Sequence, residues 1–126
     1  MVNAVDEIAL LPGRLREESL SDREVVLPYS DALAAIDILA RSGIGFYGWE
    51  GWARYPQGHG HFSEYPGITL KPRTDETWTA FVGRSADACR TSIIDAWQRW
   101  NSQPKDERVL YFCLTGSDED WWRQSG

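Results

Sequence analysis

"SDALAAIDILARSGIGFYGWE", residues 30–50, is the stretch that decides the fold, because it predicts a helix that leads directly into a strand. Ser30 can cap the helix, and leucine and isoleucine recur at three-residue steps along one of its faces. Gly43 supplies the left-handed residue at which such a helix ends. Residues 44–50, "IGFYGWE", are rich in aromatic side chains and predict a buried or half-buried strand.

The residues after this unit predict further elements. Residues 84–101, "RSADACRTSIIDAWQRWN", predict a second helix with Ser85 as its N-cap, because apolar residues recur at three- and four-residue steps. Residues 108–116, "RVLYFCLTG", are apolar at nearly every position and predict a central strand. Shorter strands are predicted over residues 25–28, 67–72 and 76–82.

Together these elements predict an α+β fold, with two helices packed on one face of a mostly antiparallel sheet of about four to five strands. The 126 residues suffice for a single domain, 1–126, with a core of its own. Residues 117–126, "SDEDWWRQSG", are acidic and then aromatic, and they are a candidate flexible tail of this domain.

The formal net charge is −6, which argues against a nucleic-acid-binding protein, because contacts to phosphates need a basic surface. The same charge fits a basic protein partner. No apolar run is long enough to span a membrane, and Asp6 and Glu7 stand where a secretory signal carries basic residues. Cys89 and Cys113 are far apart and lack metal-ligand spacing. We therefore expect a cytoplasmic protein with reduced cysteines, no cofactor and no membrane partner.

Residues 46–62, "FYGWEGWARYPQGHGHF", contain the side chains that most resemble a metal or catalytic site. His59 and His61 suggest a metal, but zinc needs three or four ligands and only Glu64 could join them. The flanking glycines predict a mobile loop. Glu50 and Glu64 could serve as an acid/base pair, but such a pair needs a substrate cleft, for which this short chain leaves little room. We therefore expect neither a metal site nor an enzyme.

Tryptophan is more abundant than a core of this size needs, so we expect some indoles to be exposed or half-exposed. Trp49 and Trp52 are three residues apart in the predicted strand, which places them on opposite faces. One of the two should point into the core and the other should be available to a partner. The seven tryptophans are Trp49, Trp52, Trp78, Trp97, Trp100, Trp121 and Trp122.

Several segments follow one another in an order that is known from a protein family. They are "VDEIALLPGRL" (5–15), "VVLPYSDALAAIDILARSGIGFYGWEGW" (25–52), "DETWTAF" (75–81) and the helix from Ser85 with its following strand. This order resembles the immunity protein 40 family, small bacterial proteins associated with polymorphic and contact-dependent toxin systems. The resemblance covers roughly residues 4–115.

The glycine-bearing strand carries the clearest part of this resemblance. A Gly-Gly-acid motif of the family falls on Gly48, Trp49 and Glu50, with Trp49 in place of the second glycine and Glu50 in place of a shorter acid. A tryptophan-bearing segment downstream aligns with Trp78.

The resemblance implies a protein that binds and neutralises a cognate toxin, and the acidic charge of the chain suggests that this toxin is basic. Two alternatives remain open: a small ligand- or carbohydrate-binding module that uses the aromatic residues of 46–62, and a structural or oligomerisation domain. The residues do not name the toxin or the oligomeric state. The expected contact residues are Glu50, Trp52, Tyr55 and Glu64, followed by Asp75 and Glu76.

Overall fold

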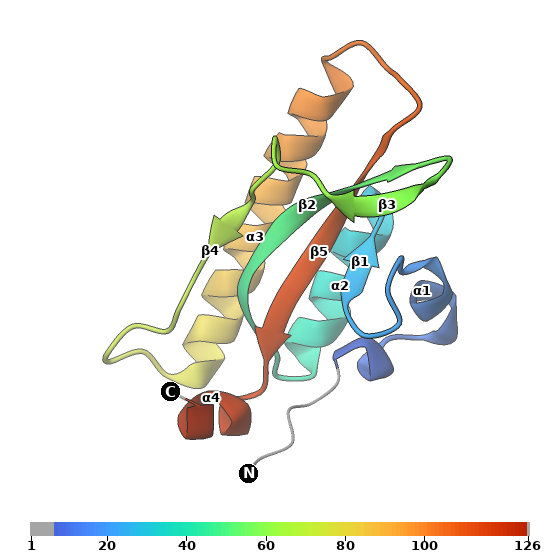
Figure 1. Ribbon diagram of the computed structural model, residues 1–126. Helices are drawn as coiled ribbons and strands as arrows, with labels where there is room; N and C mark the ends of the chain where they lie inside the picture. Colours follow the sequence, from blue (N-terminus) through green and yellow to red (C-terminus); the bar gives the residue numbers. More distant parts are fainter. Residues whose placement is uncertain (1–6, 126) are drawn as a thin grey trace.

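Five antiparallel strands form one sheet, and two long helices lie behind it in Figure 1. The computed structural model describes residues 7–125. The predicted α+β class, with two helices on an antiparallel sheet, is confirmed. In chain order the elements are η1 (Glu7–Leu10), α1 (Gly13–Glu18), β1 (Val25–Leu27), α2 (Tyr29–Arg41), β2 (Gly45–Tyr55), β3 (Gly58–His61), β4 (Ile68–Thr69), α3 (Trp78–Asn101), β5 (Val109–Ser117) and α4 (Glu119–Ser125).

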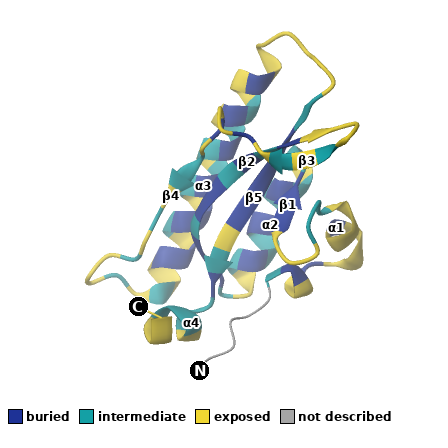
Figure 2. Cartoon of the chain, viewed as in Figure 1, coloured by how far each residue is buried: buried dark blue, intermediate teal, exposed yellow. Residues whose placement is uncertain are grey.

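Strand β5 lies inside the sheet, as its apolar sequence predicted. The strand order is β1-β5-β2-β3, and β4 also pairs with β2. Leu110, Phe112 and Leu114 of β5 belong to the main core between the sheet and the helices. Tyr111 and Cys113 alternate with them and belong to a smaller cluster on the other face. Both sets are buried, so β5 is buried over most of its length (Figure 2).

The unit of residues 30–50 folds as a helix that leads into a strand, with one change at its start. Helix α2 begins at Tyr29, after Pro28 at the N-cap, so Ser30 lies inside the first turn and does not cap it. Proline is favourable at a helix start because its missing N–H has no partner there. Gly43 has φ +82° and ends the helix as expected, and β2 begins two residues later at Gly45.

Helix α3 is longer than predicted, and the strand expected over 76–82 is wrong. The helix starts at Trp78, and the N-cap is Thr77, whose hydroxyl accepts the Ala80 N–H at 3.1 Å. Ser85, the expected N-cap, is buried inside α3. Its Oγ accepts the N–H of Phe46 in β2 at 2.9 Å, so this serine joins the helix to the sheet. The alternation of 76–82 was typical of a strand, but the Thr77 cap commits the segment to a helix.

The β2–β4 contact is close enough to require glycine. The pairing of β2 with β5 shifts by one residue between Phe46 and Gly48, which marks a bulge. Gly48 has φ +143°, and a Cβ added to it would lie 1.9 Å from the carbonyl oxygen of Ile68. Gly67 has φ +76°, and its Cβ would lie 1.7 Å from the carbonyl oxygen of Trp49. The two strands can therefore pair at this distance only with glycine at both positions.

The candidate tail of residues 117–126 contains a short helix that contacts the sheet. Residues 119–125 form α4, in which the rings of Trp121 and Trp122 lie 5.9 and 5.6 Å from the ring of Tyr47 in β2. The aromatic side chains that follow the acidic run thus hold the segment against the sheet. At the other end, residues 4–6 of the segment that resembles the immunity proteins lie outside the described residues.

Candidate functional site

Residues 51–61 form a hairpin, so the mobile loop predicted here is wrong. Strand β2 continues to Tyr55, and β3 returns beside it with Trp52 opposite His61 and Arg54 opposite His59. The glycines alternate with the histidines, and this alternation is the period-two pattern of a strand. Gly58 and Gly60 suggested flexibility, but both are residues of β3, and a Cβ at either position would meet no atom closer than 3.9 Å.

The hairpin gathers five polar and aromatic side chains on the face of the sheet that points away from α2 and α3. They occupy alternate positions of β2 and β3, and alternate residues of a strand share a face. No helix of residues 7–125 lies across this part of the sheet (Figure 1). We call this surface the hairpin face; its residues are Glu50, Trp52, Arg54, His59 and His61.

The indole of Trp52 lies against both histidines. Its ring centroid is 5.6 Å from that of His59 and 5.0 Å from that of His61. His61 also pairs with Glu50, with 3.3 Å between Nδ1 and Oε2. Both members of this pair are well exposed, at 69% and 44% of their side-chain area, so the pair contributes little to stability. The contacts instead hold a half-buried tryptophan beside an accessible carboxylate.

Trp49 and Trp52 face opposite sides of the sheet, as predicted from their spacing. Trp49 lies in the core, where its Nε1 donates to Ser92 Oγ at 3.0 Å. Trp52 is half-buried, and its buried Nε1 has no hydrogen-bond acceptor among the described residues. An unpaired buried donor costs about 1–3 kcal/mol. The two indoles therefore do not form one flat platform for a sugar.

A small apolar cluster lies beside the hairpin face, on the same side of the sheet. It contains Tyr111, over whose ring the Arg54 guanidinium lies at 5.6 Å, and Cys113. Burial raises the pKa of Cys113 to about 12, and the negative charges of Glu24 and Glu50 add to this effect. The thiol therefore stays protonated at neutral pH and is no nucleophile. Cys89 lies in the main core on the other side of the sheet, where burial also raises its pKa to about 12, and both cysteines are free.

Three of the expected contact residues lie away from the centre of the hairpin face. Tyr55 ends β2 and is 39% exposed. Glu64 is exposed in the turn after β3, between Phe62 and Tyr65, whose rings pack on α3. Asp75 is exposed in the segment before α3. The structure thus joins Glu50 with Trp52, and it adds the two histidines and an arginine that the sequence analysis did not select.

Glu76 lies away from the hairpin face, and its carboxylate forms hydrogen bonds within the protein. Its Oε2 and Oε1 accept from Nε and Nη2 of Arg84 at 2.7 and 2.8 Å, and Oε1 also accepts the N–H of Arg73 at 3.0 Å. The hydrogen bonds from Arg84, together with that from Arg73 and the charges of both arginines, lower the pKa of Glu76 to about 2. The side chain is only 10% exposed, so Glu76 fixes the segment before α3 to the helix.

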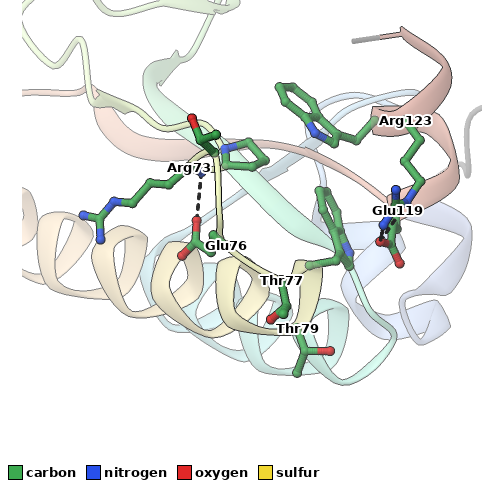
Figure 3. Close-up of a pocket in the computed structure, with 10 residues that line it drawn as sticks. Arg73, Glu76, Thr77, Thr79, Glu119 and Arg123 are labelled. Carbon is green, nitrogen blue, oxygen red and sulfur yellow. Dashed lines mark hydrogen bonds and ion pairs between the residues drawn. The ribbon is translucent and has the colours of Figure 1, made fainter.

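Next to Glu76 lies an open hollow of about 570 Å³ between the start of α3 and α4. Figure 3 shows Thr77 and Thr79 on the side of α3, with Glu119 and Arg123 of α4 across from them. Arg123 is paired with Glu119 at 2.6 Å, so these two charges at the hollow offset each other. The hollow is a further surface that a ligand or partner could contact.

Comparisons with protein-family models, with curated proteins and with solved structures each found no match to this chain. Among residues 7–125, no three His, Cys, Asp or Glu side chains are arranged to hold a metal ion. Within the same range, every helix is too short or too polar to cross a membrane. The geometry of the hairpin face and of the hollow is therefore what bears on function.

Proposed function

We propose that this protein is an immunity protein, which binds a cognate bacterial toxin in the cytoplasm and neutralises it by direct contact. The observation that carries the proposal is the hairpin face: Trp52, held between His59 and His61, lies beside the accessible carboxylate of Glu50 on a sheet face that no helix of the described chain covers. The resemblance of residues 4–115 to the immunity protein 40 family points to the same function.

A tight protein contact draws most of its free energy from a few central side chains, among which tryptophan is enriched. An indole that is already held in place loses little conformational freedom on binding. Trp52 meets this condition, because rings of β3 and the small cluster beside it on the same face of the sheet fix it before any partner arrives. Trp52 is therefore the residue on which we expect binding to depend most.

The charge of the chain suggests the chemistry of the toxin. The net charge is −6, and Glu50, Glu64 and Asp75 all have exposed or partly exposed carboxylates. Complementary charge accelerates association and excludes partners of the wrong sign. We therefore propose a toxin with a basic contact surface.

The test uses the C-terminal domain of the protein encoded immediately upstream of this chain. Co-expression should relieve its toxicity, and the purified proteins should form a complex. Trp52→Ala should weaken the complex roughly 30-fold or more, as expected for a central interface residue. Trp122→Ala, which removes a half-exposed indole at the hollow, is the matched control and should leave affinity unchanged.

Two results would contradict the proposal in different ways. Absence of both complex formation and protection would rule out the immunity function for this pair of proteins. A complex that Trp122→Ala weakens and Trp52→Ala does not would place the contact at the hollow instead of the hairpin face.

A further inference from the structure

The outer edge of β1 is closed by the chain itself. The backbone N–H of Val26 donates to Ser19 Oγ at 3.0 Å, and its carbonyl oxygen accepts the N–H of Leu20 at 3.0 Å. The three residues of β1 are all buried. No outward-facing backbone group of Val26 is therefore left for a strand of another molecule.

The outer edge of β2 is closed as well, beyond the part that pairs with β3. The N–H of Gly51 donates to the carbonyl oxygen of Tyr65 at 2.7 Å, and the carbonyl of Gly51 accepts the N–H of Phe62 at 2.9 Å. Farther along, β4 pairs with Gly48 and Trp49 of β2. The segment after β3 thus follows β2 along this edge.

Strand β3 has no such cover. The bond between Phe62 and Gly51 fixes the alternation of the antiparallel ladder, in which bonded and non-bonded residue pairs alternate. Gly60 with Ala53 is then a bonded pair, whereas His61 with Trp52 and His59 with Arg54 are not. The N–H and carbonyl groups of His59 and His61 therefore point away from β2, and β2 is the only strand that β3 contacts in the part of the chain that the structure describes.

We infer that the edge of β3 is where the toxin binds, by adding an extended segment of its own to the sheet as a further strand. This inference rests on the proposed immunity function and specifies its binding mode. An edge that presents alternating backbone donors and acceptors is matched by another extended backbone, which supplies the complementary groups at the same repeat. The short β3 offers four such groups, two from His59 and two from His61.

The side chains around the edge indicate the kind of segment that fits. On the hairpin face, Glu50 lies one strand behind β3, roughly 9–10 Å from an added strand, which a lysine or arginine side chain can bridge. On the opposite face, Gly58 and Gly60 carry no side chain, and the nearest atom to a Cβ at Gly60 is the Tyr55 hydroxyl at 3.9 Å. The toxin segment should therefore alternate basic residues with bulky apolar ones.

The experiment compares two substitutions at one position in the same complex with the upstream-encoded domain. His61→Pro removes an N–H that the sheet of the free protein does not use, and its ring obstructs a neighbouring strand; proline is tolerated at such edge positions. His61→Ala removes the imidazole and keeps the N–H. We expect His61→Pro to weaken binding about tenfold or more beyond His61→Ala, because His61→Ala loses only the ring contact with Trp52 and keeps the N–H. In the wild-type complex, amide hydrogen exchange at His59 and His61 should slow.

Several results would overturn the inference. One such result is a wild-type complex whose affinity His61→Pro does not change and in which amide exchange at β3 does not slow. In that case the immunity function stands and the binding mode is wrong. If His61→Ala weakens binding as much as His61→Pro, the imidazole and not the backbone is the contact. If the chain alone forms dimers that His61→Pro abolishes, the occupant is a second copy. If no wild-type complex forms, the proposed function and this inference both fail. Should His61→Pro not fold, the exchange measurement on the wild-type complex decides.

Discussion

The two outer edges of the sheet differ, because the chain covers the β1 edge and leaves the β3 edge open. At β1, a serine hydroxyl and one turn of the chain satisfy the outward backbone groups of Val26, and the strand is buried. At β3, the outward groups of His59 and His61 face solvent, and only the shortness of the strand and two polar side chains protect it. The chain covers the β1 edge with a few residues but leaves the β3 edge open. This difference is the strongest structural reason to look for a partner at β3.

The largest effect should come from breaking the closed edge of β2. Gly48→Ala would place a Cβ 1.9 Å from the Ile68 carbonyl oxygen at φ +143°, so β4 must leave β2. We expect a loss of about 3–5 kcal/mol in the free energy of unfolding, measured by denaturant titration. Gly83→Ala is the control, because nothing lies within 4 Å of its Cβ position in α3, and it should stabilise the protein slightly. Equal effects of the two substitutions would contradict the requirement for glycine at the β2–β4 contact.

Ser19→Ala should open the β1 edge at a smaller cost. It leaves the buried N–H of Val26 without its acceptor, which we expect to destabilise the protein by about 1–3 kcal/mol. Amide exchange at Val26 should accelerate at the same time. Ser21→Ala serves as the comparison, because Ser21 accepts N–H groups only of the exposed residues Arg23 and Glu24. An unchanged exchange rate at Val26 would show that Ser19 does not close this edge.

The pair of Glu76 and Arg84 should make the stability of the folded protein depend on pH. The pKa of Glu76 is lowered from 4.5 to about 2 in the folded protein, so its stabilising contribution is complete above pH 4.5 and is lost as the pH falls from about 4.5 to about 2. In Glu76→Gln, thermal unfolding temperatures should fall less steeply across this window than in the wild type. Asp75→Asn removes a neighbouring carboxylate that forms no ion pair with any described residue, and it should keep the wild-type slope.

The smallest effect on stability should come from the open edge. His61→Ala removes a well-exposed polar contact with Glu50 and should change the free energy of unfolding by less than about 0.5 kcal/mol. Denaturant titration at neutral pH measures this. A loss comparable with that of Ser19→Ala would mean that the imidazole supports the hairpin and that the two edges differ less than their hydrogen bonds indicate.

The sequence predicted the elements whose residues signal them locally. The helix that ends at Gly43 and the apolar β5 were expected because periodicity and an exit glycine lie within a few residues. The start of α3 was not expected, because the alternation of 76–82 is ambiguous until the Thr77 cap and the Glu76–Arg84 pair are seen in space. Such pairs depend on residues that lie apart in the chain.

The candidate site was predicted only in part, because it too depends on residues that lie apart in the chain. Glu50 and Trp52 were selected from their aromatic, glycine-bearing context, and the spacing of Trp49 and Trp52 placed them on opposite faces correctly. The histidines were assigned to a loop because glycine signals flexibility more often than a strand. Their alternation with glycine was the available signal, but only the register with β2 shows that His61 lies opposite Trp52.

The order of the strands also has a consequence for how this chain reaches its native state. Strands β1 and β2 are not neighbours; both pair with β5, which follows α3 in the chain. During synthesis the β2–β3 hairpin and α2 can form from local contacts, whereas the sheet must wait until β5 has left the ribosome and inserted between its partners. Such distant pairings slow folding, because the intervening chain must be ordered before they contribute. We therefore expect cooperative folding of the whole sheet to begin when β5 inserts between β1 and β2.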